Sequence, residues 1–256
     1  MSPRGLTGAL SMFTIFPVRS APAVSRADGR RIMQWLPTLG LALGALSGLL
    51  VTGVAHEAPQ ARFVAAVLGV GALAALTRGL HLDGLADTAD GLASHQPPGP
   101  ALEIMRRSDI GPFGVLTLVF VLLLDVGAVV SMDAAVWKPT AALAAAAATG
   151  RMAALFAAHQ RVPAARPGGF GAIVAGSIPS GAVAVQAVAL LVVGGVLAKS
   201  VDADVLGWVI VQAAALALAS LLVRHACRRL GGVTGDVFGA VIEGATAATL
   251  VGIAFV

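Results

Sequence analysis

Residues 112–132 read PFGVLTLVFVLLLDVGAVVSM, a run of 21 residues whose one charged side chain is Asp125. A helix of this length measures about 31 Å, enough to cross a hydrocarbon core about 30 Å thick. Six more apolar stretches are predicted to span a membrane, at 34–54, 61–77, 135–157, 179–198, 205–223 and 237–256. The sequence therefore predicts an all-α polytopic membrane protein with about seven transmembrane helices, forming one integral membrane domain over residues 1–256.

The composition of the chain agrees with a lipid environment. Only 12% of its residues are charged, whereas soluble domains average about 25%, so a soluble enzyme, a DNA-binding protein and a secreted disulfide scaffold are all excluded. The single cysteine, Cys227, rules out an internal disulfide and a metal site built from thiolates. The net charge of +4 does not imply nucleic acid, because in a membrane protein the position of the positive charges matters more than their sum.

Lysine and arginine are distributed unevenly between the predicted connections. The amino-terminal block and the even-numbered connections hold 14 of the 17: Arg4, Arg19, Arg26, Arg30, Arg31, Arg78, Arg106, Arg107, Arg151, Arg161, Arg166, Arg224, Arg228 and Arg229. The odd-numbered connections hold only Arg62, Lys138 and Lys199. By the positive-inside rule the amino terminus and the even-numbered connections are cytoplasmic, and the carboxyl terminus lies outside.

The amino-terminal segment resembles part of a signal peptide, because Arg4 precedes the mostly apolar stretch Gly5–Val18. However, Thr7, Ser11 and Thr14 interrupt the stretch, and basic residues flank both of its ends. We therefore expect residues 1–33 to be a cytoplasmic segment with a short interfacial helix rather than a cleaved signal.

Three carboxylates stand where the second span reaches the cytoplasm, in the stretch 77–91, TRGLHLDGLADTADG. Asp83, Asp87 and Asp90 are spaced i, i+4, i+7, which places them within about 60° of one another on a helix. Like charges at this spacing repel each other, and a divalent cation would remove the repulsion. Oxygen ligands without thiolates favour Mg²⁺, although a solvated acidic face is the simpler alternative.

Residues beside the stripe add to the predicted site. His81 is a candidate general base, a candidate ligand or a structural polar residue. Gly84 and Gly91 leave room for a ligand or another helix to approach.

The sixth connection reads RRLGGVTGD over residues 228–236. Its Thr234 and Asp236 are ordinary helix-capping residues, but the turn also brings Asp236 to the predicted cation. Glu243 falls inside the seventh span, where a buried ionisable residue is a site candidate or a structural hydrogen-bonding partner.

Arginines and glycines on the same predicted face suit an anion. Arg106, Arg161 and Arg166 offer bidentate forks for phosphate, and Gly169 and Gly171 offer backbone N–H groups. The positive-inside rule alone also places arginines there.

Four stretches resemble the cobalamin synthase family, the adenosylcobinamide-GDP ribazoletransferases. The signature is GLHLDGLADTADG at 79–91, and it is followed in the same order by EIMRRSDIGPFG at 103–114, the stretch Ala165–Gly171, and GGVTGDVFGAVIE at 231–243. The resemblance extends from FTIFPV at 13–18 to the last span. Two positions depart from the pattern: Arg78 replaces a usual Gly and is a candidate phosphate contact, and Asp109 replaces a usual Arg and receives no role.

The resemblance implies a Mg²⁺-dependent membrane enzyme that joins adenosylcobinamide-GDP to α-ribazole or α-ribazole 5′-phosphate and releases GMP. Asp83, Asp87, Asp90 and Asp236 would form the metal and pyrophosphate site, with His81 beside it. Arg106, Arg166, Gly169, Gly171 and Thr234 are the candidate anion-binding residues. The partners expected are these small substrates and the lipid bilayer, with no nucleic acid, and the sequence leaves a homo-oligomer open.

Two other functions compete with this reading. A CDP-alcohol phosphotransferase also uses aspartates at a membrane surface, but its pattern has Ala-Arg after Asp-Gly-x-x, and here Leu85-Ala86-Asp87 follows Gly84. A divalent-cation transporter would use Asp125 and Glu243 as pathway residues, yet most of the acidic residues gather at one face.

The topology has a direct test. A reporter fused after Val256 is expected to be active in the periplasm, because an odd number of spans separates the two termini. A reporter that is active only in the cytoplasm would remove one span from the prediction.

Overall fold

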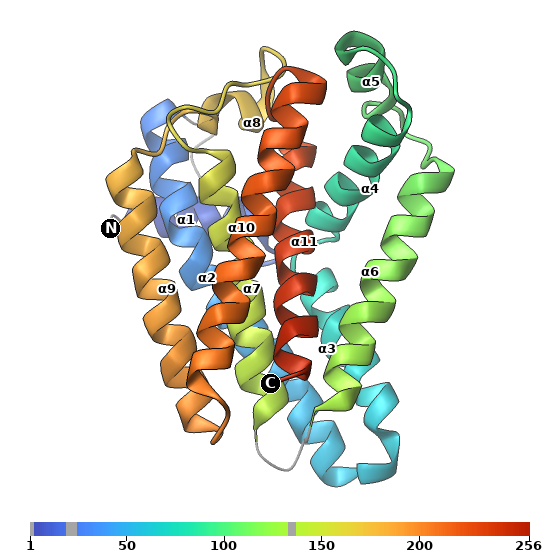
Figure 1. The fold of residues 1–256 in the computed structure, drawn as a ribbon, viewed down its shortest axis with the longest axis vertical. Helices are drawn as coiled ribbons and strands as arrows, with labels where there is room; N and C mark the ends of the chain where they lie inside the picture. The colour runs from blue at the N-terminus through green and yellow to red at the C-terminus, as the bar shows by residue number, and fades with distance from the viewer. Residues whose placement is uncertain (1–2, 19–24, 133–136) are drawn as a thin grey trace.

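The computed structural model describes residues 3–18, 25–132 and 137–256 and arranges them as a bundle of helices (Figure 1). Seven helices in the described residues are long and apolar enough to cross a membrane. They are α2 (Arg26–Glu57), α3 (Arg62–Leu76, preceded by the 3-10 turn Pro59–Ala61), α6 (Pro112–Ser131), α7 (Lys138–Ala157), α9 (Ser180–Ser200), α10 (Val205–Leu230) and α11 (Gly235–Ala254). All seven fall on the predicted spans, and the all-α prediction is confirmed.

Four shorter helices complete the described part of the chain: α1 (Pro3–Phe13), α4 (Leu80–Ala93), α5 (Pro98–Ile104) and α8 (Gly169–Val174). Helices α4, α5 and α8 lie at one end of the bundle, at the top of Figure 1, which we call the site end. Arg19 and the first residues of the predicted span 135–157 lie outside the described residues.

Two of the spanning helices extend beyond the predicted limits. Helix α2 begins at Arg26 instead of residue 34, because Ser25 and Asp28 form a capping box there. Helix α10 continues to Leu230, where Gly231 ends it in the left-handed conformation. The arginines of these segments therefore project from helix ends and not from loops.

Arg151 corrects the charge count of the fourth connection. It belongs to α7, where its side chain is 2% exposed, so it adds nothing to the positive charge at the predicted cytoplasmic face. The remaining described arginines of that connection, Arg161 and Arg166, follow the end of α7 as predicted.

Helix α7 is the centre of the bundle because its side chains are small. The alanine run Ala141–Ala148 is buried throughout. Against it lie three glycines of α2, Gly40, Gly44 and Gly48, where a Cβ atom would overlap the α7 backbone. Small residues at a four-residue interval let two helices approach closely, which is how helices associate where lipid leaves no hydrophobic driving force.

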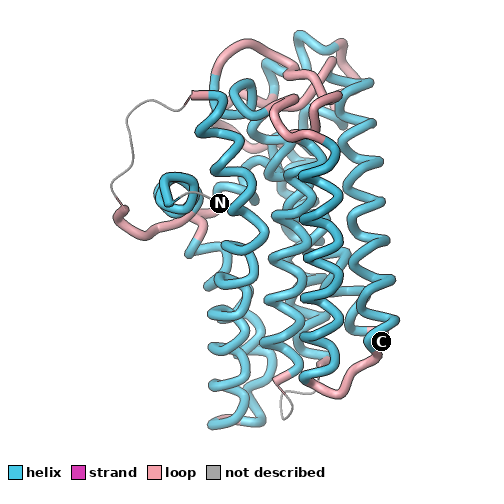
Figure 2. Tube along the Cα trace, turned by 90° about the vertical axis from the view of Figure 1, so that its left-hand side faces the viewer, coloured by secondary structure: helices cyan, strands magenta, loops and turns pink. Residues whose placement is uncertain are grey.

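Helix α1 lies across the bundle, and in Figure 2 it is seen end-on beside helices that run vertically. The amide of Ile15 donates to the carbonyl of Leu76 at 2.9 Å. The guanidinium of Arg78 donates to the carbonyl of Met12 at 2.7 Å. Arg78 therefore ties α1 to the end of α3, and its predicted contact with phosphate stays a prediction.

A sharp break separates α3 from α4. Arg78 and Gly79 both have positive φ, 57° and 65°, and α4 starts again at Leu80. The new helix packs against α11 and α6 and carries the predicted carboxylate stripe into the site end of the bundle.

The close contact between α2 and α7 gives a stability prediction. Gly44→Ala is expected to lower the free energy of unfolding by about 1–3 kcal/mol, because its Cβ has no room beside Leu143. The matched control is Gly53→Ala in the same helix, where a Cβ meets nothing within 4 Å. Thermal unfolding in detergent measures both, and equal melting temperatures would contradict the packing argument.

Candidate functional site

The site is organised by a glycine contact between α4 and α11. A Cβ on Gly84 would stand 2.9 Å from the Cα of Asp236, and one on Gly239 would stand 2.7 Å from the carbonyl oxygen of His81. Both positions must therefore be glycine for the helices to come this close. The contact places Asp236, at the start of α11, beside the carboxylates of α4. The prediction that Gly84 leaves room for another helix to approach is confirmed.

The four predicted metal-binding aspartates occupy one electrostatic neighbourhood. Asp83 is exposed, and Asp87 and Asp90 are half-buried on the same helix. Burial raises the pKa of Asp87 to about 6, and the three neighbouring carboxylates add to the shift while Arg166 opposes it. The folded protein therefore holds negative charges together at a cost in stability, as a cation site does before its cation arrives.

Asp90 also has a structural role. Its two carboxylate oxygens accept backbone N–H groups from Gly111 at 2.7 Å and Gly114 at 2.9 Å. A Cβ at either glycine would overlap the carboxylate. Asp90 thus caps α6 and fixes it to α4, while each oxygen keeps a lone pair, so its role as a metal ligand stays a prediction.

Five of the predicted anion-binding residues, Arg106, Arg166, Gly169, Gly171 and Thr234, line one cavity of about 380 Å³, which we call the basic lobe. Its walls are Arg106, Arg166 and residues 167–172 on one side and Val233, Thr234 and Gly235 on the other. The lining includes Gly169 and Gly171, and Gly169 has φ of 76°. Arg161 does not line this cavity.

Arg166 links the basic lobe to the carboxylates. One guanidinium nitrogen, Nη2, lies 3.3 Å from Oδ2 of Asp236, and the hydroxyl of Thr234 donates to the same oxygen at 3.0 Å. The other nitrogen, Nη1, is buried and has no hydrogen-bond partner among the described residues. Thr234 also accepts the amide of Val237, so the helix-cap reading of this turn is confirmed alongside its place in the site.

A second cavity of about 270 Å³, the apolar lobe, adjoins the basic lobe at Phe170 and Gly235. It is lined mainly by apolar side chains, together with His81, Asp83 and Asp236. The ring of Phe13 from α1 stacks on His81 at 6.0 Å and meets Phe170 edge-on at 5.5 Å.

The sequence analysis missed Phe13 and Phe170 as site residues. Their one signal was that both stand in stretches that resemble the family.

A buried ionisable cluster forms the floor beneath His81. Nδ1 of His81 lies 3.6 Å from Glu243, and Glu243 interacts electrostatically with Arg151 and Asp125. Burial, and then the charge of Arg151, hold the pKa of His81 well below its usual value. The imidazole is therefore neutral near pH 7, and its contact with Glu243 is not an ion pair.

The described residues contain no metal site built from protein ligands alone. No three His, Cys, Asp or Glu side chains in the described ranges converge closely enough to hold one. Mg²⁺ in enzymes is usually held by one or two carboxylates together with substrate phosphates and water. The aspartates fit that kind of site, and they do not fit a cage built from protein ligands alone.

The raised pKa of Asp87 predicts a pH-dependent stability. Because the folded state binds this proton more tightly than the unfolded state, stability falls as pH rises from about 4 to about 6 and the cost persists above. Asp87→Asn is expected to melt at a higher temperature than the wild type at pH 8 without divalent cations. The difference in melting temperature between Asp87→Asn and the wild type should narrow below pH 6, where Asp87 becomes protonated.

The matched control for this experiment is Asp109→Asn, which changes an exposed aspartate at the same end and should show no such difference. If Asp87→Asn melted at a lower temperature than the wild type at pH 8, the argument that repulsion between the carboxylates destabilises the folded protein would be contradicted.

Comparison with known proteins places the chain in a family. Residues 5–254 match the family model described as cobalamin-5-phosphate synthase. A protein of Frankia casuarinae named adenosylcobinamide-GDP ribazoletransferase is 40% identical, with 94% of this chain and 91% of that protein covered. Proteins of the same name from Nocardioides sp. and Stutzerimonas stutzeri are each 39% identical, with 94% and 96% of both chains covered.

No solved structure matches the chain. The match over nearly the whole length, together with relatives that are all named as transferases, shows that this membrane protein is an enzyme and belongs to the cobalamin-5-phosphate synthase family.

Proposed function

We propose that the enzyme joins adenosylcobinamide-GDP to α-ribazole or its 5′-phosphate, releasing GMP and forming adenosylcobalamin or its 5′-phosphate. We further propose that it requires Mg²⁺ and works at the cytoplasmic face of the bacterial inner membrane. The observation that carries this is that a basic lobe adjoins an apolar lobe whose lining includes Asp83 and Asp236, two of four aspartates that interact electrostatically. The names of the relatives and the excess of positive charge at the site end support it.

The reaction is a phosphoryl-type transfer. A ribose hydroxyl of α-ribazole attacks the phosphorus linked to cobinamide, the bond from that phosphorus to the oxygen of GMP breaks, and the hydroxyl proton passes to a base. Such transfers are catalysed mainly by positioning and by neutralising charge. Arg166 supports this role because it lines the basic lobe and its buried Nη1 has no hydrogen-bond partner among the described residues. Arg106 lines the same lobe. Both would hold pyrophosphate oxygens.

Asp83, Asp87 and Asp236 are the residues we propose to hold Mg²⁺, one or two at a time, together with substrate phosphate. When bound, the ion would neutralise the pyrophosphate and the leaving GMP. Asp90 would contribute chiefly by fixing α6 to α4, because each of its oxygens accepts one backbone N–H, from Gly111 or Gly114.

His81 is the proposed general base. It lines the apolar lobe next to Asp83, its imidazole is held neutral, and neither ring nitrogen has a hydrogen-bond partner among the described residues. A neutral imidazole can accept the hydroxyl proton. We place the aromatic base of α-ribazole in the apolar lobe, because Phe13 and Phe170 give it aromatic walls.

The proposal is tested by incubating purified protein with adenosylcobinamide-GDP, α-ribazole 5′-phosphate and Mg²⁺ and measuring release of GMP. Asp83→Asn and Asp87→Asn are each expected to lower kcat roughly 100-fold or more, since each removes charge stabilisation at the transferred phosphate. Chelation by EDTA should abolish the activity, and added Mg²⁺ should restore it.

The control is again Asp109→Asn, an exposed aspartate outside both lobes, which should keep wild-type activity. Mg²⁺ should also raise the melting temperature of the wild type more than that of Asp87→Asn, a readout independent of turnover. Near-normal kcat in both site variants would falsify the assignment of these aspartates.

A further inference from the structure

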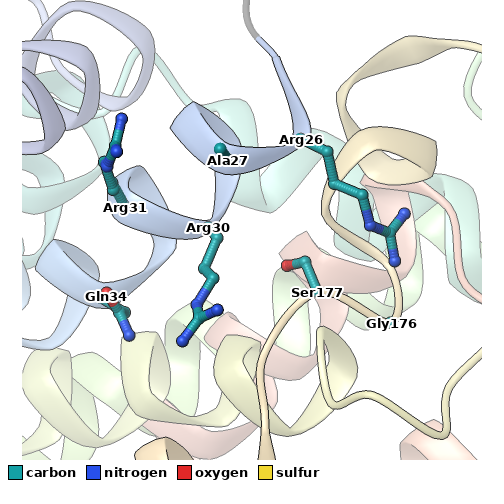
Figure 3. Close-up of a pocket in the computed structure, with 7 residues that line it drawn as sticks. All are labelled: Arg26, Ala27, Arg30, Arg31, Gln34, Gly176 and Ser177. Atoms are coloured by element: carbon teal, nitrogen blue, oxygen red, sulfur yellow. The ribbon is translucent and has the colours of Figure 1, made fainter.

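A second basic cavity lies at the site end, on the far side of α2 from the apolar lobe. It has a volume of about 650 Å³ and is lined by Arg26, Arg30, Arg31 and Gln34 of α2 and by Gly176 and Ser177. Figure 3 shows Arg26 and Arg30 extending on either side of Ser177, while Arg31 turns away. The apolar lobe is bounded instead by Met33 and Leu36 on the other face of the helix.

The positive charge of this cavity is not balanced by protein. Arg31 pairs with Asp28 at 3.2 Å, and the same carboxylate caps α2 through Ser25. Neither Arg26 nor Arg30 has a carboxylate partner in the described ranges. Arg26 donates to the carbonyl of Ala175 at 2.8 Å, which fixes its guanidinium at the rim.

Ser177 gives an independent sign of a missing ligand. Its hydroxyl oxygen is buried and has no hydrogen-bond partner among the described residues, yet the residue lines the cavity. A buried hydroxyl without a partner costs free energy. An acceptor such as a phosphate oxygen would satisfy it together with the two arginines.

An apolar groove continues from this cavity along the bundle. It has a volume of about 590 Å³, shares Gln34 with the cavity, and has Ala148 of α7 among its lining residues. Its walls are Pro37, Thr38 and Leu41 of α2 and a face of α9 that includes Val185, Ala189 and Val193. Helix α9 packs on α7 and α10. The groove therefore stays open between α2 and α9, which are both membrane-spanning helices.

We propose that this cavity and groove bind one anionic phospholipid. Its phosphate lies between Arg26 and Arg30 with Ser177, and an acyl chain lies in the groove between α2 and α9. Basic pockets between transmembrane helices at the cytoplasmic side suit acidic lipid head groups. A soluble phosphate compound would satisfy the arginines but would leave the apolar groove unfilled, which is why we assign a lipid.

The bound lipid would brace the segment that forms the basic lobe. The connection from α7 to α9 contributes Arg166 and Gly169 to that lobe and then Gly176 and Ser177 to the lipid cavity. A lipid head group bound at Gly176 and Ser177, the carboxyl-terminal part of this connection, would restrain the whole connection. Activity in vesicles containing phosphatidylglycerol should therefore exceed activity in phosphatidylcholine alone.

The test measures lipid binding directly and needs no substrate, so its outcome is independent of the proposed transfer. The full-length protein is placed in nanodiscs of phosphatidylglycerol and phosphatidylcholine, and native mass spectrometry records which lipid it retains. The wild type is expected to retain phosphatidylglycerol. Arg26→Gln with Arg30→Gln should bind it roughly 30-fold more weakly, and Arg30→Gln alone should show part of the loss.

Two further variants separate the possible sources of phosphate. Ala189→Trp fills the groove from an exposed position on α9 and should also release the lipid while the arginines remain. Arg228→Gln, an exposed arginine at the same end that lines neither cavity, is the matched control and should retain it.

Unchanged retention in the Arg30→Gln and Ala189→Trp variants, or an equal loss in Arg228→Gln, would overturn the proposal. It would also be overturned if Ala189→Trp kept the lipid while inorganic phosphate displaced it, because a soluble phosphate would then be the occupant.

Discussion

Close packing around α7 is the constraint on which the rest of the structure depends. Lipid tails are as apolar as the side chains of the helices, so dispersion contacts between closely approaching backbones must hold the bundle. Helix α2 approaches through Gly44, and α11 approaches Gly150, where a Cβ would overlap Ile242 and Thr246. Once α11 is fixed, Gly239 fixes α4. The positions of Asp236 and of the aspartates on α4 therefore depend on glycines that have no chemical role of their own.

This rigidity explains how the enzyme keeps like charges together. Aspartates that repel one another would separate if their helices were free to move, but Asp90 fastens α6 to α4 and Gly84 fastens α4 to α11. On the proposed mechanism this repulsion would favour binding, because a cation that arrived with the substrate would relieve it. Deeper in the bundle the charges have opposite signs, because Arg151 interacts electrostatically with Glu243 in the interior. A positive charge there also disfavours a cation pathway between Glu243 and Asp125.

Much of the site was predictable from the sequence, and the rest was not, for physical reasons. Span lengths and helical spacing are local properties, so the seven helices and the shared face of the stripe followed from the residues alone. The residues of the basic lobe were found because arginine and glycine are the types that suit phosphate. Contacts between helices depend on register, which no single helix encodes. For that reason the capping role of Asp90, the tether made by Arg78 and the burial of Arg151 appeared only in the structure.

Helix α1 has a consequence for the shape of the candidate site. It lies across the bundle (Figure 2) and supplies Phe13 and Met12 as part of the wall of the apolar lobe. The apolar lobe is thus partly walled by a helix that is not one of the seven spanning helices and that is tied to the end of α3 through Ile15 and Arg78. A change that displaced α1 would therefore alter the shape of this lobe while the glycine contact between α4 and α11 stayed in place.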